Sequence, residues 1–121
     1  MLPPHEPGDE TIAGVYAAAA AAAADPREAE EATVRAFHAA APETLDPERV
    51  AAVAVRLVLH RNPAPAFARM DTPDAEAVAL CRLLRLDVDR VAALLGVAAP
   101  EIRRRLTRGL RAALPEPVCG A

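Results

Sequence analysis

Apolar residues recur at helical spacing along most of the chain, and short polar or proline-containing segments interrupt them. Amphipathic helices repeat their apolar positions about every 3.6 residues, whereas half-buried strands alternate every second residue. No segment alternates over a useful strand length, so the sequence predicts an all-α fold. The predicted helices cover residues 10–24, 26–40, 47–61, 72–84, 88–95 and 100–114.

Asp-Pro pairs mark the start of two predicted helices, at Asp25-Pro26 and at Asp46-Pro47. The aspartate can accept from the free N–H groups of the first turn, and proline at the first helical position loses no hydrogen bond. Glu28 stands where a capping box places its second partner. From the spacing in the third helix we expect a buried side formed by Val50, Val53, Ala54, Leu57 and Val58.

The sharpest pattern is Leu86–Leu114, which predicts two helices joined by a tight turn. Asp87 is the expected N-cap of the first helix, and Gly96 ends it because glycine adopts left-handed φ at little cost. Pro100 opens the second helix. At about 100° per residue, its apolar side holds Ile102, Leu106, Gly109, Leu110 and Ala113. The opposite side and its flanks hold Arg103, Arg104, Arg105, Arg108 and Arg111.

Arginines on a helix are often only a solvated face. A short apolar helix, a glycine turn and a basic second helix together are more specific, because a helix-turn-helix places such a second helix in the DNA major groove. We therefore predict that this basic helix contacts DNA.

Two motifs of this stretch, V-A-A-L-L-G-V at 91–97 and I-R-R-R-L-T-R at 102–108, resemble a known domain. It is the promoter-reading C-terminal domain of bacterial RNA polymerase sigma factors of the small extracytoplasmic-function type. Upstream, D-P-R-E-A-E-E-A-T-V-R-A-F at 25–37 is similar to the polymerase-binding helix of the same family.

The resemblance implies double-stranded promoter DNA and the RNA polymerase core as partners, with an anti-sigma protein as a further candidate. It implies DNA-facing roles for Arg103, Arg104, Arg105 and Arg108, and polymerase-facing positions at Glu30, Glu31, Val34 and Arg35. Val34-Arg35 stands where the family has Gln-Glu, and Val50 where it has a tryptophan. An alternative therefore stays open: a helical protein-interaction module, binding polymerase, an anti-sigma protein or itself, that has lost initiation.

Two prolines, Pro63 and Pro65, disfavour helix between the third and fourth predicted helices and indicate a linker. We thus predict two small helical lobes joined by a Pro-rich linker, the second lobe being a helix-turn-helix. The expected boundaries are a flexible tail at 1–9, a sigma-like lobe at 10–61, the linker at 62–71, the DNA-binding domain at 72–115 and a tail at 116–121.

Composition narrows the function further. The net charge is −3, but residues 1–70 hold six arginines against ten acids and residues 71–121 hold eight against seven. Nucleic-acid contact must therefore be local. With no serine, no glycine-rich phosphate loop and three scattered histidines, we expect no enzyme, cofactor, metal or small-molecule substrate.

The expected location is the cytoplasm. Two cysteines, Cys81 and Cys119, form no disulfide framework. The polar, proline-bearing start does not read as a signal peptide, and the alanine run at 17–24 is too short to span a bilayer. We therefore expect no membrane partner.

Overall fold

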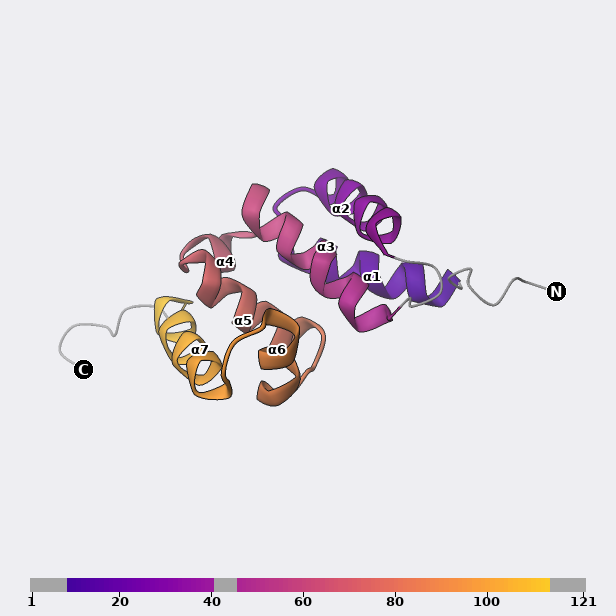
Figure 1. Cartoon of the computed structure of the whole chain (residues 1–121). Coiled ribbons are helices and arrows are strands. Elements are labelled where there is room, and N and C mark those ends of the chain that lie inside the picture. The colour runs from indigo at the N-terminus through magenta and orange to yellow at the C-terminus, as the bar shows by residue number, and fades with distance from the viewer. Residues whose placement is uncertain (1–8, 41–45, 114–121) are drawn as a thin grey trace.

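The computed structural model describes residues 9–40 and 46–113, and over these residues the chain is all-helical (Figure 1). The helices are α1 (Asp9–Ala22), α2 (Pro26–Ala39), α3 (Pro47–Arg61), α4 (Pro65–Ala68), α5 (Thr72–Leu83), α6 (Val88–Leu95) and α7 (Ala99–Ala113). The predicted tails, apart from Asp9, lie outside the described residues.

Capping side chains mark the starts of three helices, α2, α3 and α6. The side chains of Asp25, Asp46 and Asp87 each accept a hydrogen bond from a backbone N–H two or three residues further on, at 2.9, 3.0 and 2.8 Å. These three predicted caps are confirmed. Helix α5 differs, because its N-cap residue is Asp71 and the side chain of Asp71 makes no cap bond.

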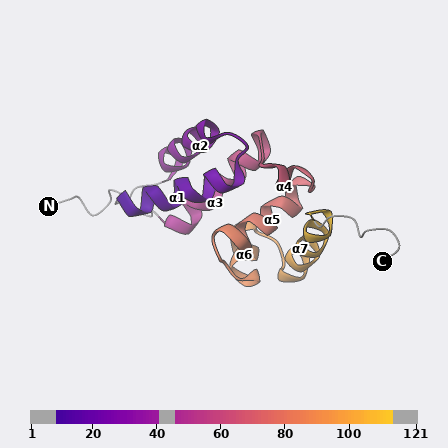
Figure 2. The ribbon, with the colours of Figure 1, turned by 180° about the vertical axis from the view of Figure 1, so that it is seen from behind.

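Helix α3 lies at the centre of the molecule and packs against α1, α2 and α5 (Figures 1 and 2). It is therefore buried on more than the single side that its spacing indicated. Val55 and Leu59 are buried, as are the expected Val50, Ala54 and Val58, and each of the five is 5% exposed or less. Val53 was expected inside but is 39% exposed, because α5 covers a different side of the helix.

The segment 62–71 is hydrogen-bonded to the end of α1. The backbone N–H of Ala24 donates to the carbonyl of Asn62 at 3.0 Å, and that of Ala64 donates to the carbonyl of Ala22 at 2.7 Å. Helix α4 follows at once and contacts α5. Backbone bonds thus join the ends of α1 and α3.

The C-terminal helices α5, α6 and α7 form a second cluster. Helix α7 packs mainly against α5 and α6, and it lies on the far side of them from α1 and α2 (Figure 1). Gly96 has φ 70° and ends α6 as predicted, with the N–H of Val97 donating to the carbonyl of Ala92 at 3.1 Å. Arg85, just after α5, has φ 56°, which the sequence had not indicated.

Ion pairs join the two clusters. Glu76 of α5 is buried; Arg56 of α3 donates to it, and His60 Nε2 lies 3.6 Å from its Oε1. Arg90 of α6 reaches the start of α3, with Nε 2.6 Å from Glu48 Oε2 and Nη2 3.2 Å from an oxygen of its N-cap carboxylate. The hydrogen bond to Glu48 is the main reason why the pKa of Arg90 is raised.

Candidate nucleic-acid interface

The outer face of α7 carries a shallow hollow lined by Arg103, Arg104, Thr107 and Arg108. Ile102 and Gly109 are buried on the opposite side of the helix, so packing against α5 and α6 fixes which face is turned outward. Three of the five arginines predicted opposite the apolar side or on its flanks therefore lie together, namely Arg103, Arg104 and Arg108. Arg111 is exposed, and Arg105, on the flank, is largely covered.

The buried stripe of α7 is narrower than its spacing predicted. Leu110 was expected on the apolar side but is 40% exposed. It lies about 80° around the helix from Ile102 at about 100° per residue. Since α7 packs mainly on α5 and α6, a residue at the edge of the stripe meets solvent.

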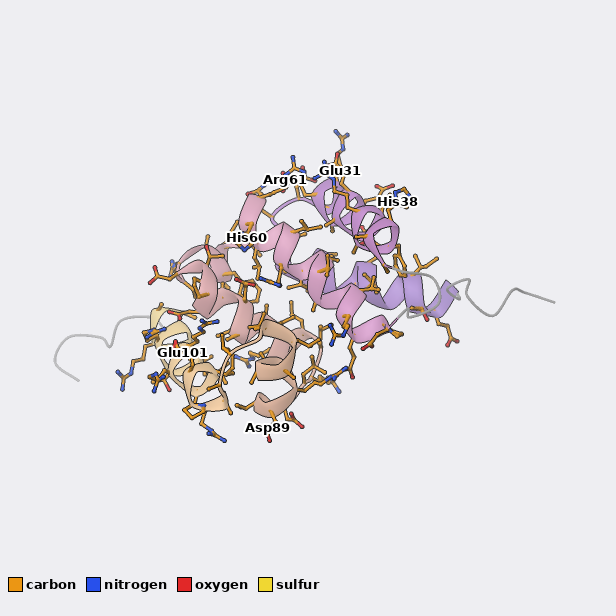
Figure 3. All side chains as sticks on the ribbon, in the orientation of Figure 1. Glu31, His38, His60, Arg61, Asp89 and Glu101 are labelled. Carbon is orange, nitrogen blue, oxygen red and sulfur yellow. The ribbon has the colours of Figure 1, made fainter. Side chains whose placement is uncertain are left out.

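Glu101 neutralises part of the basic face from within α7 (Figure 3). Its Oε2 accepts from Arg104 Nε at 3.1 Å and from Nη2 at 2.9 Å, and its Oε1 accepts from Arg105 Nε at 3.4 Å. The hydrogen bond from Arg104 is the main cause of the lowered pKa of Glu101. A first-turn glutamate also favours the helix dipole.

Asp74 of α5 holds Arg108 from the other side. Asp74 is only 4% exposed. Its Oδ1 accepts from Arg108 Nε at 3.3 Å and from Nη2 at 3.1 Å, and Oδ2 lies 3.4 Å from Nε. This hydrogen bond is the main cause of the raised pKa of Arg108.

The other two arginines of this helix, Arg103 and Arg111, have no such carboxylate partner among the described residues. Within residues 9–40 and 46–113, no carboxylate lies within 4 Å of Arg103 or Arg111. Of the five arginines, only Arg104, Arg105 and Arg108 thus pair with a carboxylate of the described chain, that of Glu101 or Asp74. The surface keeps an excess of positive charge where α7 meets solvent.

The residues implied as polymerase-facing also lie together. Glu30, Glu31, Val34 and Arg35 line one open hollow on α2, beside Arg27. Val34 is 50% exposed. Arg61 Nη1 lies 3.3 Å from Glu31 Oε2 and ties this face to the end of α3 (Figure 3).

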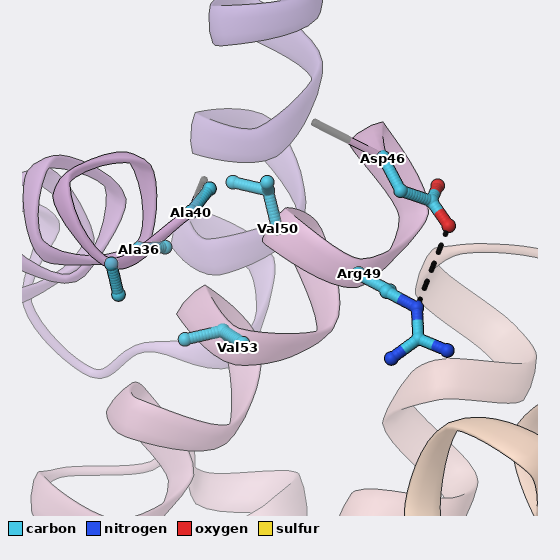
Figure 4. A pocket seen from close by; sticks show the side chains of 7 residues that line it. Ala36, Ala40, Asp46, Arg49, Val50 and Val53 are labelled. Carbon is cyan, nitrogen blue, oxygen red and sulfur yellow. Dashed lines mark ion pairs between the residues drawn. The ribbon is translucent and has the colours of Figure 1, made fainter. Parts of the chain in front are cut away.

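A second hollow lies between α2 and α3, lined by Ala36, Ala39, Ala40, Asp46, Arg49, Val50 and Val53 (Figure 4). Arg49 Nε lies 3.8 Å from Asp46 Oδ2 at its edge. Val53 also borders the next hollow along α3, formed with Arg56, Leu57 and His60. The exposed Val53 therefore lies between two hollows along α3.

The sequence did not reveal the two buried acids of α5, Asp74 and Glu76. Both lie in an otherwise apolar run, and polar residues in such a run are expected to face solvent. Their partners are on α7 and α3, 34 and 20 residues away in the chain. No local pattern connects residues so far apart.

Comparison with known proteins finds no matching family model, no similar curated protein and no similar solved structure. Among the helices of the described residues, none has both the length and the apolar character that crossing a membrane requires. Over the same residues, no three His, Cys, Asp or Glu side chains are grouped so that they could hold a metal ion.

Proposed function

We propose that this chain is a sigma-factor-like transcription protein. In this proposal, α7 is the recognition helix of a helix-turn-helix that binds double-stranded promoter DNA, and α2 associates with the RNA polymerase core. The observation that carries the proposal is the outward face of α7, where Arg103, Arg104 and Arg108 line one hollow. The likeness of residues 91–97 and 102–108 to promoter-reading domains supports the same function.

The electrostatics of α7 support a contact with a polyanion. Arg103 and Arg111 are exposed and have no carboxylate partner among the described residues, so their charges are available to phosphates. Arg104, Arg105 and Arg108 lie beside them, each paired with Glu101 or Asp74. Since the whole chain has a net charge of −3, attraction to DNA is confined to this face.

The polymerase contact rests on α2. Glu30, Glu31, Val34 and Arg35 share one exposed face, as a docking surface requires. An exposed valine beside Glu30, Glu31 and Arg35 offers both apolar area and charge to a partner. Residues 25–37, which resemble a polymerase-binding helix, include all four.

DNA binding is tested with the whole chain, a short mixed-sequence duplex and fluorescence anisotropy between about 50 and 200 mM salt. The double variant Arg103→Ala/Arg111→Ala should bind more weakly. Its log–log salt slope should become shallower by about 1.8, since each lost phosphate contact removes about 0.9. The control Arg27→Ala/Arg49→Ala removes the same charge from α2 and α3 and should leave the slope unchanged. Equal slopes for both variants would refute DNA contact by α7.

One observation favours the alternative, a helical interaction module that has lost initiation. Val34 and Val53 are both exposed, and Val53 connects two hollows along α3. Such apolar surface suits a protein partner such as polymerase, an anti-sigma protein or a second copy. Run-off transcription with core polymerase separates the two functions. Promoter-specific transcripts support the first, whereas capture of the core without transcripts supports the second.

A further inference from the structure

The pair formed by Asp74 and Arg108 differs from the other contacts of the basic face. Asp74 belongs to α5, not to α7, and it is buried, whereas the side chain of Arg108 is 55% exposed. Close approach of the two helices at Gly109 brings them together, since an added Cβ there would lie 3.4 Å from Asp74 Cβ. The buried carboxylate of Asp74 thus holds the exposed guanidinium of Arg108.

This arrangement makes Arg108 hard to release. Arg108 Nε and Nη2 both donate to Asp74, which occupies one edge of the guanidinium. If Arg108 moved to a phosphate, it would leave a carboxylate buried without its partner, which is strongly unfavourable. Glu101 Oε1 lies 3.6 Å from Nη2 and adds a second restraint.

The charge of Asp74 also acts directly on DNA. A phosphate approaching Arg108 meets an ion pair whose charges nearly cancel, not a free cation. The number of counterions released on binding, and with it the salt slope, depends on how many phosphates the protein neutralises. The neutralised Arg108 therefore adds little to that count, in contrast to Arg103 and Arg111.

We propose that Asp74 restrains Arg108 from the DNA backbone and thereby keeps the affinity of α7 for DNA below what its five arginines would give. The inference rests on the proposed DNA binding by α7. Its consequence is weak attachment to arbitrary sequence, because the phosphate contacts supply essentially all of non-specific binding. With Arg108 restrained, recognition of the base sequence would depend on the other residues of α7.

The test compares the salt slope of duplex binding for the wild type and for Asp74→Asn, which keeps the shape of the side chain but removes its charge. The variant should bind several-fold more tightly at low salt, with a slope steeper by about 0.9, one phosphate contact. Glu10→Gln changes the net charge equally on the exposed face of α1 and should leave the slope as it is. The double variant Asp74→Asn/Arg108→Ala should return to the wild-type slope, since the gain acts through Arg108.

Arg108→Lys provides a second route if Asp74→Asn lowers the folded population. A lysine keeps the charge but cannot reproduce the two-nitrogen contact with Asp74, so the slope should again steepen. Unchanged slopes in both Asp74→Asn and Arg108→Lys, with helix content retained by circular dichroism, would overturn the restraint. If Arg103→Ala/Arg111→Ala still lowers the slope in that case, DNA binding by α7 stands and only the restraint is wrong. A wild type that binds no duplex overturns both.

Discussion

A Cβ added to Gly109 of α7 would come within 2.8 Å of Val78 Cγ2 on α5. Real Cβ atoms do not approach so closely, and the buried, β-branched Val78 has little rotamer freedom with which to turn away. Overpacking of this kind costs about 1–3 kcal/mol, of which better helix propensity recovers about 1. We expect Gly109→Ala to lower the free energy of unfolding by about 1 kcal/mol in urea titrations.

Gly14 on α1 provides the matched control, because an added Cβ there meets no atom within 4 Å. Gly14→Ala should raise the free energy of unfolding by about 0.5–1 kcal/mol through helix propensity alone. Equal effects of the two substitutions would show that α5 and α7 do not approach closely at residue 109.

Arg85 ends α5 in the left-handed region, with φ 56°. An L-residue with a Cβ pays roughly 1–2 kcal/mol for this conformation, which glycine adopts freely. Part of the gain from glycine is lost to the greater entropy of the unfolded chain. Arg85→Gly should therefore raise the free energy of unfolding by about 0.5–1 kcal/mol, measured by urea denaturation.

The reciprocal substitution is Gly96→Ala, which places a Cβ on a residue with φ 70°. It should destabilise the protein by about 1 kcal/mol. If Arg85→Gly were instead destabilising, the backbone after α5 would not be left-handed in solution.

Arg90 joins α6 to the start of α3 through Glu48 and Asp46. Arg90→Lys keeps the charge but loses the planar fork that reaches both carboxylates. We expect a lower urea midpoint in low salt and faster amide hydrogen exchange in α6. The difference in urea midpoint between the variant and the wild type should nearly vanish in about 1 M NaCl, where the Debye length is only about 3 Å. A salt-independent difference would point to lost packing of the arginine stem.

Glu101 should make the stability of α7 depend on pH. Its pKa is lowered from the ordinary 4.5, mainly by the hydrogen bond from Arg104. Because the pKa of Glu101 is lowered, its ion pairs contribute fully to the stability of the folded protein above the ordinary pKa. This contribution is lost as the pH falls through the lowered pKa. The urea midpoint of the wild type should thus exceed that of Glu101→Gln at pH 6.

The difference between these two proteins should shrink steadily as the pH falls below about 4.5, the ordinary pKa. Since the pair is exposed, the whole effect should also weaken in high salt. A difference that is constant from pH 6 to acid conditions would assign the effect of Glu101→Gln to something other than its charge.

Most helix boundaries and the basic face could be predicted because their signals are local, but the short helix α4 lies in the segment that was predicted to be a linker. The caps at Asp25, Asp46 and Asp87 depend on backbone groups two or three residues away, and Gly96 on its own φ. Helical spacing alone placed Arg104, Arg108 and Arg111 opposite the apolar side of the last helix, with Arg103 and Arg105 on its flanks.

Features that depend on contacts between distant helices could not be predicted. Val55 is buried and Val53 is not, because α5 packs on α3. The spacing of apolar residues within either helix does not show that the two helices pack together. The pairing of Asp74 with Arg108 likewise needs the packing of α5 on α7. Glu28 matches the sequence pattern of a capping box, but its Oε2 is buried without a hydrogen-bond partner.

Helix α5 contributes to both clusters, with Glu76 turned toward α3 and Asp74 toward α7. The separation between the outer faces of α2 and α7 is therefore set by side-chain packing, not by the length of a tether. An assembly that engaged both faces at once would have to present its two contact points at a single spacing. Insertions between α3 and α5 would not widen that spacing unless they also broke the ion pair between Arg56 and the buried Glu76.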